Sequence, residues 1–312
     1  MKASIIILNW NGANLLRITL PSVIAAVKHT GVDHEIIVVD NCSQDDSVNV
    51  IRTEFPMVKL IALTGKNRGF GEACNIGVKE SKHPILVLLN NDMMVEEDFL
   101  NPLLSLFHEP DLFAAVGTIK SWDKQKLEIG FITAKFKFGF IKVNRRGQTI
   151  NSEEIPMPTF YASGGAVAYS KEKYLLLGGF DDIYYPFYWE DVDLSYQAWK
   201  RGWKVIYQPQ SVIYHKGGAT IGKSYKRNYV KEIYYKNRFL FIWRNITSWW
   251  HLTQHFLCLL PHFIGTILVG KFYYVKGFIR ALRYINQVME RRRKEKQFHR
   301  RTDSQIFSIP NL

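Results

Sequence analysis

Cysteine is scarce in this chain of 312 residues, with Cys42, Cys74 and Cys258 as its three thiols. The number is odd and no pair stands in a Cys-x-x-Cys spacing, which argues against a disulfide framework and a zinc knuckle. Reduced thiols of this kind are typical of a cytosolic protein, so we expect a cytoplasmic location.

The sequence also lacks a long uninterrupted apolar run. Residues 1–9 hold a few apolar residues that end at Asn9, fewer than the core of a signal peptide, and they predict a first buried strand. The apolar stretch that begins at Trp249 is broken by His255, Pro261, His262 and Lys271. It therefore falls short of the ~20 mostly apolar residues that a membrane-spanning helix needs.

Two glycine-rich signatures of nucleotide binding are missing as well. The stretch Lys66-Asn-Arg-Gly-Phe-Gly71 is neither a Walker A loop nor a Gly-x-Gly-x-x-Gly motif. It opens a predicted helix, where two cations and free N–H groups suit a phosphate. An ordinary loop-to-helix cap explains the same residues.

Acidic residues are outnumbered, since 41 Lys and Arg against 28 Asp and Glu give a net charge of +13. Much of the excess lies beyond residue 271, next to Trp249-Trp250 and the apolar stretch, and it includes Arg291-Arg-Arg-Lys294. Tryptophans, an apolar face and a basic face together predict an amphipathic helical segment at 246–312 that lies on an anionic membrane. The alternative is a helix docked on the rest of the protein.

The first part of the chain alternates short β-branched runs with helical patterns. This alternation predicts an α/β fold, with a mainly parallel sheet and helices on both of its faces. Strands are expected at 4–8, 35–39, 58–62, 85–89, 113–118 and 166–169 and near Val205 and Val212; helices at 13–28, 46–54, 70–80, 96–106, 171–177, 191–200 and 225–244; and loops with some antiparallel strand at 121–158.

Polar residues follow the ends of three predicted strands, the edge at which open α/β sheets bind ligands. They are Asn9, Trp10 and Asn11 after the first strand, Asp40 after the second, and Asn90, Asn91 and Asp92 after the fourth. Trp10 can stack on a base, Asp40 can accept a hydrogen bond from a base or ribose, and Asp92 can coordinate a hard cation. Each also has a structural explanation, as a buried aromatic, a turn residue or a helix cap.

Three acids, Glu190, Asp191 and Asp193, begin a predicted helix directly after the aromatic stretch 184–189. Capping explains one or two acids at a helix N-terminus, but it does not explain the aromatics, which suit a sugar-binding wall. Downstream, His215 ends an apolar run before Gly217-Gly218 and is either a metal ligand or a core histidine.

Taken in order, these pieces resemble the family 2 inverting glycosyltransferases with the GT-A fold. The nearest match is the bacterial rhamnosyltransferase-like branch that builds cell-surface polysaccharides. The resemblance covers residues 3–245, which we expect to form the catalytic domain 1–245. It rests on Asn9-Trp-Asn, Val38-Val-Asp-Asn, Asn67-Arg-Gly-Phe, Leu89-Asn-Asn-Asp, Ser163-Gly-Gly-Ala, Trp189-Glu-Asp-Val-Asp-Leu and His215-Lys-Gly-Gly-Ala-Thr.

The resemblance implies a role for each piece. Asp191 would be the catalytic base beside Glu190, and Asp92 with His215 would hold Mg²⁺ or Mn²⁺. Asn90 replaces the first Asp of the family's Asp-x-Asp motif, which leaves one carboxylate for the metal. Implied nucleotide-sugar contacts are Asn9, Trp10, Asn11, Asp40, Lys66, Asn67, Arg68, Gly69, Asn90, Asn91 and Asp92; implied acceptor contacts are Gly164, Gly165, Ala166, Trp189 and Asp193.

The reaction implied is inverting transfer of one sugar from a nucleotide-diphosphate sugar, of the dTDP-rhamnose or UDP-sugar class, to a saccharide or lipid-linked acceptor. No Gln-x-x-Arg-Trp motif of processive members appears, which favours a single addition. A sugar-1-phosphate nucleotidyltransferase would carry a glycine-rich loop where Asn9-Trp-Asn-Gly12 stands. A nucleic-acid-binding protein is the third hypothesis, but no such motif appears, so no nucleic-acid partner is expected. We expect a peripheral enzyme on the inner face of the cell membrane.

Overall fold

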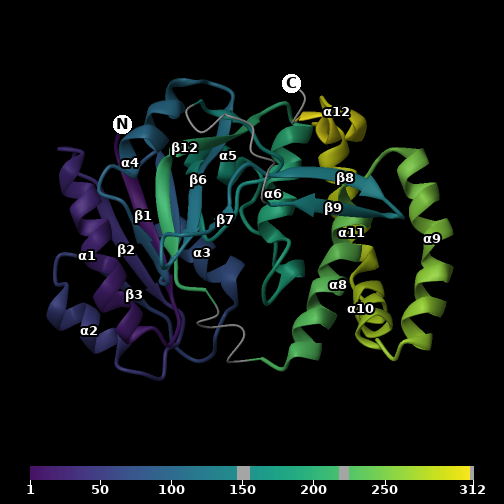
Figure 1. Ribbon diagram of the computed structural model, residues 1–312, viewed down its shortest axis with the longest axis horizontal. Coiled ribbons are helices and arrows are strands. Elements are labelled where there is room, and N and C mark those ends of the chain that lie inside the picture. The colour runs from purple at the N-terminus through teal and green to yellow at the C-terminus, as the bar shows by residue number, and fades with distance from the viewer. Residues whose placement is uncertain (146–154, 218–224, 310–312) are drawn as a thin grey trace.

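The computed structural model describes residues 1–145, 155–217 and 225–309. A mixed sheet of ten strands runs through the first part of the chain, with helices packed on both faces. The helices that follow residue 226 stand together beside the sheet, with α9 outermost (Figure 1).

Four parallel strands form one half of the sheet, in the order β4-β1-β2-β3. Their near-continuous Ile, Val and Leu runs suit strands that are covered on both faces. The predicted strands and crossover helices are confirmed to within one or two residues: β1 (Ala3–Asn9), α1 (Ala13–His29), β2 (Glu35–Asp40), α2 (Ser47–Glu54), β3 (Lys59–Ala62), α3 (Phe70–Glu80) and β4 (Ile85–Asn90).

The other half of the sheet is mixed because one strand runs against its neighbours. β11 (Ala166–Ser170) lies antiparallel between β4 and β6 (Leu112–Ser121). β12 (Lys204–His215) then pairs parallel with β6 and is one strand rather than the two expected. Its register shifts between Tyr207 and Val212, around Pro209, because proline has no N–H to give to the ladder.

The prediction for residues 92–106 is wrong in part. A short strand, β5 (Met93–Val95), pairs antiparallel with β12, and the helix α4 begins only at Leu100 (Leu100–Ser105) and ends in a 3₁₀ turn (Leu106–His108). Asp92 therefore precedes a strand and does not cap a helix. The pairing of Val95 with Ile213 is long-range, and local periodicity does not reveal it.

The antiparallel strands expected within 121–158 are present in the described part of that region. They are β7 (Leu127–Ile129) and β10 (Met157–Pro158) at the sheet, and the hairpin of β8 (Thr133–Lys137) with β9 (Phe140–Asn144). Residues 146–154 lie outside the described residues. The helices expected next are also confirmed: α5 (Lys171–Leu176), α6 (Glu190–Lys200) after a 3₁₀ turn (Asp182–Tyr184), and α8 (Arg227–Asn245).

The C-terminal region is helical, as expected: α9 (Trp249–Leu268), α10 (Tyr273–Leu282), α11 (Ile285–Lys296) and α12 (Asp303–Phe307). Tyr274, Val288 and Ile306 from these helices are buried in the same core as Phe239 of α8. A buried ion pair joins Lys200 of α6 to Asp303 at 2.5 Å. No helix in the described part of the chain is long and apolar enough to cross a membrane.

Candidate active site

The carboxyl ends of β1, β2 and β4 meet at one edge of the sheet, as the sequence predicted. Asn9 lies beside Asp40 in the ladder, and its amide donates to Asp40 Oδ2 at 2.8 Å. Its Oδ1 accepts from Asn91 Nδ2 at 2.6 Å, and Ser43 donates both its N–H and its hydroxyl to Asp40. The predicted nucleotide-sugar contacts Asp40 and Asn91 are thus buried, and each is hydrogen-bonded to the buried Asn9 side chain.

Gly12 is required by the close packing at this edge. A Cβ at position 12 would stand 2.0 Å from Asn91 Nδ2 and 2.5 Å from Asn9 Oδ1. Any larger residue would therefore break the link between β1 and β4. Asn11, exposed with φ 51°, uses its Oδ1 to accept from the Gln44 N–H at 2.7 Å, which ties the loop after β1 to the loop after β2.

The loop 66–69 is held by Asn41, a residue that the sequence analysis treated only as a turn former. The Asn41 side chain donates to Asn67 Oδ1 and to the Gly69 carbonyl, and it accepts from the Arg68 N–H at 2.8 Å. Gly69, at φ 79°, makes the turn into α3. The Arg68 guanidinium pairs with Glu72 at 3.0 Å, and Lys66 is exposed.

Asp92 and His215 are brought together from β4 and β12, as predicted. His215 Nε2 lies 3.5 Å from Asp92 Oδ2, and its Nδ1 lies 2.7 Å from Oε2 of Glu128 on β7. Hydrogen bonds to Asp92 and then Glu128 raise the pKa of His215 to about 9. Glu128 was missed from the sequence, because nothing in 121–158 shows which acid reaches the end of β12.

These side chains fit a divalent cation as part of its shell. Asp92 Oδ1 is buried and has no hydrogen-bond partner among the described residues, and one nitrogen of His215 faces the same carboxylate. Carboxylate and imidazole are both ligands for Mn²⁺. No three His, Cys, Asp or Glu side chains converge as a metal site in the described ranges, so other ligands would have to come from the substrate.

The three acids of α6 differ sharply in access. Glu190 is 7% exposed and Asp193 is 2% exposed, whereas Asp191 is partly open. Asp191 Oδ2 accepts from the Gly164 N–H at 3.0 Å. Burial raises the pKa of Asp191, and the Gly164 hydrogen bond opposes that shift. Asp191 is thus the most exposed of the three acids, and Glu190 borders an open pocket.

The segment Ser163-Gly-Gly-Ala166 lies between Asp191 and the end of β4. The Gly165 carbonyl accepts from the Asn90 N–H at 2.9 Å, and a Cβ on Gly164 would stand 3.3 Å from Asp191 Cβ. Ala166 is buried in β11 opposite Leu89. The two glycines thus let the predicted acceptor segment pass close to both Asp191 and Asn90.

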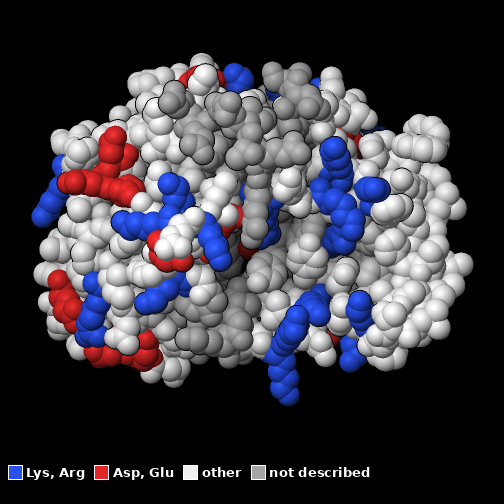
Figure 2. Space-filling view, in the orientation of Figure 1, with Lys and Arg blue, Asp and Glu red and all other residues white. Residues whose placement is uncertain are grey.

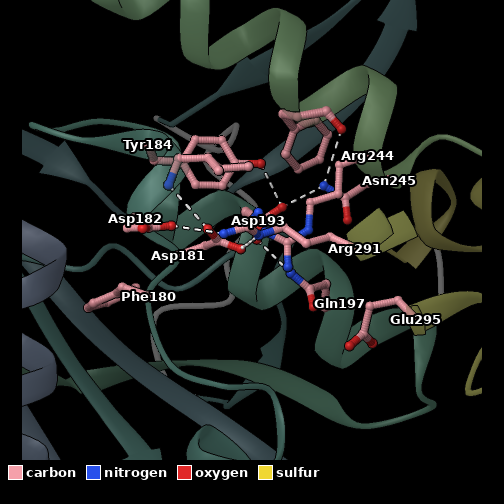
Figure 3. Close-up of polar contacts among 12 residues, drawn as sticks. Phe180, Asp181, Asp182, Tyr184, Asp193, Gln197, Arg244, Asn245, Arg291 and Glu295 are labelled. Carbon is pink, nitrogen blue, oxygen red and sulfur yellow. Dashed lines mark hydrogen bonds and ion pairs between the residues drawn. The ribbon is translucent and has the colours of Figure 1, made fainter. Parts of the chain in front are cut away.

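The Asp193 carboxylate is hydrogen-bonded and ion-paired to neighbouring side chains (Figure 3). Tyr184 and Asn245 donate to Oδ1 at 2.7 and 2.6 Å, and Gln197 donates to Oδ2 at 2.5 Å. Arg244 also pairs with it at 3.1 Å and continues to Asp181 at 2.6 Å. Acceptor contact by Asp193 stays a prediction, and this burial favours a structural role instead.

Aromatic side chains from the loop after β1 and from the segment before α6 meet at Tyr225. Trp10 lies 6.3 Å from Tyr225, which lies 5.2 Å from Phe187. Trp189 is buried against Phe241, with centroids 5.1 Å apart, so its ring belongs to the core. One open pocket is lined by Arg68, Tyr185 and Glu190, which places the predicted donor loop next to the acids that begin α6.

The fold and this set of residues define a nucleotide-sugar-dependent glycosyltransferase of GT-A type. Residues 4–176 match Glycosyl transferase family 2, and the chain belongs to that family. The match ends before Asp191 and His215, so those two residues rest on geometry and on the resemblance.

Among curated proteins, the chain is 22% identical over 238 residues to the O-antigen chain rhamnosyltransferase RfbN of Salmonella typhimurium. That alignment covers 75% of this chain and 73% of the relative. Other curated relatives are longer, and the chain spans 34% of one and 50% of another.

Among solved structures, GalNAc-T7 with UDP, GalNAc and Mn²⁺ has a TM-score of 0.60 at 19% identity, over 78% of this chain and 47% of that one. TarS 1–349 of S. aureus with UDP-GlcNAc has a TM-score of 0.59 at 15% identity, over 96% and 91%. At these identities the likeness shows the fold.

Proposed function

We propose that this enzyme transfers one sugar from a nucleotide-diphosphate sugar to an acceptor hydroxyl with inversion at the anomeric carbon. The observation that carries the proposal is Asp191, the accessible carboxylate of the acid cluster, held by the Gly164 N–H. It stands next to a pocket that Arg68 and Glu190 share. A base on one side and a cationic loop on the other are the two parts a single displacement requires.

In this reaction Asp191 accepts the proton of the acceptor hydroxyl as its oxygen bonds to the anomeric carbon. The bond from that carbon to the diphosphate oxygen breaks on the opposite face, and the electron pair leaves with the nucleoside diphosphate. Lys66 and Arg68 stabilise the charge that develops on the leaving group. No covalent intermediate forms, because Asp191 takes a proton and not the sugar.

Asp92 and His215 would hold a divalent cation, which supplies positive charge to the diphosphate. Glu128 fixes the His215 ring by accepting from Nδ1, so that Nε2 is directed at Asp92. The Mn²⁺ in the GalNAc-T7 structure belongs to that protein and supports, by analogy of fold, a metal here.

The donor class follows from the relatives. RfbN is a rhamnosyltransferase, and TarS was solved with UDP-GlcNAc, so we propose a dTDP- or UDP-linked sugar and a role in cell-surface polysaccharide synthesis. Asp40 and Trp10 would face the base. Because Asp40 already accepts three hydrogen bonds, its contact with a base would use its remaining lone pair.

The test is Asp191→Asn, assayed across a panel of nucleotide sugars. Loss of the base lowers kcat by ~10²–10⁴ while the shape of the site is kept. Donor binding, measured by calorimetry with the nucleoside diphosphate, should stay within threefold of wild type. Near-normal transfer by this variant would remove Asp191 from its role, and product of retained configuration would refute a single displacement.

We also propose an anionic membrane as the surface on which the enzyme works. α9 contains no Asp, Glu, Lys or Arg, and its outward face exposes Trp249, Leu257 and Leu268 at 74%, 72% and 80%. Figure 2 shows this side of the molecule as uncharged, with Lys and Arg beside it. Apolar residues ringed by cations suit an interface of acyl chains and anionic headgroups.

The neighbouring hairpin extends this surface. His255 of α9 lies 2.7 Å from the Gly139 carbonyl in the turn between β8 and β9. That turn exposes Phe138 between α9 and two exposed lysines, Lys135 and Lys137. By contrast, Arg291 and Arg292, part of the basic run assigned to lipid from sequence, bond to Asp181 and to the Trp243 carbonyl. Lys135 and Lys137 are exposed cations of the hairpin that α9 contacts, and we propose that these two face the headgroups.

A further inference from the structure

The catalytic acid follows a loop with an unusual backbone. Tyr188 and Trp189 are consecutive non-glycine residues in the left-handed region, with φ of 74° and 80°. Side chains disfavour this conformation, so the surrounding structure must impose it. Trp189 is the N-cap of α6, and its carbonyl accepts from the Asp193 N–H, so the loop sets the direction of the turn that carries Asp191.

The side-chain amide of Asn237, on α8, donates hydrogen bonds to three carbonyls of this loop. Asn237 Nδ2 donates to the carbonyls of Tyr184, Phe187 and Tyr188 at 2.8, 2.9 and 2.8 Å. Asn237 is fully buried, so no water competes for its two N–H groups. Because these carbonyls turn inward to reach it, the peptide planes on either side of Tyr188 are fixed.

Lys236, the residue before Asn237, binds two more carbonyls of the same loop, and we call the two side chains together the cradle. The Lys236 ammonium donates to the carbonyls of Ile183 and Tyr185, each at 2.9 Å. It is 3% exposed and stands over the ring of Tyr284 from the C-terminal helices. A buried ammonium group needs hydrogen-bond acceptors, and those of Lys236 are the carbonyls of the loop and not a carboxylate. Lys236 and Asn237 thus bind five carbonyls of residues 183–188 between them.

We propose that Lys236 and Asn237 are positioning residues for the transfer reaction: they hold residues 183–188 so that the left-handed backbone of Tyr188 and Trp189 presents Asp191 to the acceptor. Neither side chain is assigned a contact with substrate. The proposal rests on Asp191 acting as the base. It predicts that loss of the cradle slows the chemical step more than it weakens donor binding. The Asn41 side chain holds loop 66–69 from the end of β2. The bond that joins this loop to residues 183–188 runs from the Phe70 N–H to the Pro186 carbonyl at 3.0 Å, a carbonyl that neither Lys236 nor Asn237 binds.

The experiment compares Asn237→Asp with Arg238→Met. Asn237→Asp keeps the size but replaces the donor with a carboxylate that faces three carbonyls. Arg238 is the matched control, because it is buried on the same helix and donates to the Ile141 carbonyl of β9, away from the loop. We expect Asn237→Asp to lower kcat at least tenfold with a donor KM within twofold of wild type. Arg238→Met should lose less than threefold in kcat per folded molecule.

Lys236→Arg is the milder second variant and keeps a buried cation with donors. It should retain the fold and lose kcat to an intermediate degree, again without a change in donor KM. Active-site concentration is set by nucleoside diphosphate titration, so an unfolded fraction does not count as slow chemistry. Equal kcat losses for Asn237→Asp and Arg238→Met, or a loss confined to donor KM in Lys236→Arg, would overturn the proposal.

The failure of this proposal can be told from the failure of the function it rests on. If Asp191→Asn is inactive while Asn237→Asp turns over at the wild-type rate, the base stands and the positioning role is wrong. If Asp191→Asn is active, the base assignment is wrong and the positioning role falls with it.

Discussion

At the scale of single residues, Glu190 and Asp191 show how adjacent acids take different roles. Burial, then the charge of Asp191, raises the pKa of Glu190 to about 8, and its Oε2 has no partner among the described residues. Glu190 is therefore largely a neutral acid at pH 7, next to Asp191, the proposed base. Such a pair of separated pKa values is typical of catalytic sites.

Glu190→Gln should accordingly be tolerated where Asp191→Asn is not. The raised pKa means that the folded state binds a proton which the unfolded chain releases above pH ~4.5, so Glu190 costs stability as pH rises from there to about 8. At pH 7 that cost is about 3 kcal/mol. We expect Glu190→Gln to keep kcat within fivefold and to raise the free energy of unfolding at pH 7. A drop in kcat as large as that of Asp191→Asn would give Glu190 the proton-transfer role.

A second residue-scale prediction concerns Glu128, which contacts the far nitrogen of His215. Glu128→Gln should raise the Mn²⁺ concentration for half-maximal binding by ~10–100-fold, since outer partners of metal-binding histidines contribute on that scale. Calorimetry with Mn²⁺ and nucleoside diphosphate measures it. Asp123→Asn, an exposed acid on the same connection, is the control. An unchanged affinity, or binding unaffected by Asp92→Ala, would contradict the metal assignment.

At the scale of elements, His255 joins α9, α8 and the β8–β9 hairpin. Trp243 Nε1 donates to Nε2 of His255 at 3.1 Å, and Nδ1 of His255 lies 2.7 Å from the Gly139 carbonyl. Only a neutral imidazole can accept a hydrogen bond at Nε2 while it donates one from Nδ1. Burial lowers the pKa of His255 to about 4. The folded state thus excludes a proton that the unfolded chain binds below pH ~6.5.

The stability contributed by the neutral ring should be present above pH ~6.5 and lost as the pH falls toward about 4. The loss amounts to about 3 kcal/mol across that window. Denaturant unfolding at several pH values measures it, and His255→Gln should flatten the slope of stability between pH 6.5 and 4. If the slope is unchanged in that variant, another group, such as His299, is responsible.

Elements also show what the sequence could and could not reveal. Helix and strand periods located α3 and β1 because local patterns determine them, and the order of motifs located Asp191 and His215. The sequence did not reveal β5, because Val95 becomes a strand only by pairing with Ile213. The contacts of Asn41, Glu128 and Asn237 were not predicted for the same reason. Each side chain bonds to a partner far away in the sequence, and a single asparagine or glutamate has no local sequence pattern that reveals such a partner.

At the scale of the whole molecule, the C-terminal helices belong to the structure that holds the active site. Arg291 of α11 pairs with Asp181 at 2.7 Å, and Asp181 reaches Asp193 through Arg244 (Figure 3). Asp303 is buried against Lys200 and also accepts from the N–H groups of Thr247 and Ser248. The division into domains 1–245 and 246–312 stays a prediction, and these contacts tie the second closely to the first. α9 is the exception, because its outward face meets no other part of the described chain.

That face yields the last prediction. Leu257→Gln with Leu260→Gln should leave the fold intact, since both side chains are exposed on α9, and should lower binding to phosphatidylglycerol vesicles at least tenfold. Each leucine contributes ~1.5–3 kcal/mol when buried in acyl chains. Leu175→Gln with Leu176→Gln removes two other exposed leucines, from α5, and should bind as wild type does. Binding should also weaken with salt and with neutral phosphatidylcholine, because the flanking lysines need anionic headgroups. The contrary outcome is a protein that binds neither type of vesicle and forms a dimer that Leu257→Gln with Leu260→Gln disrupts. That result would show that a second copy of the chain, and not a membrane, covers this face of α9.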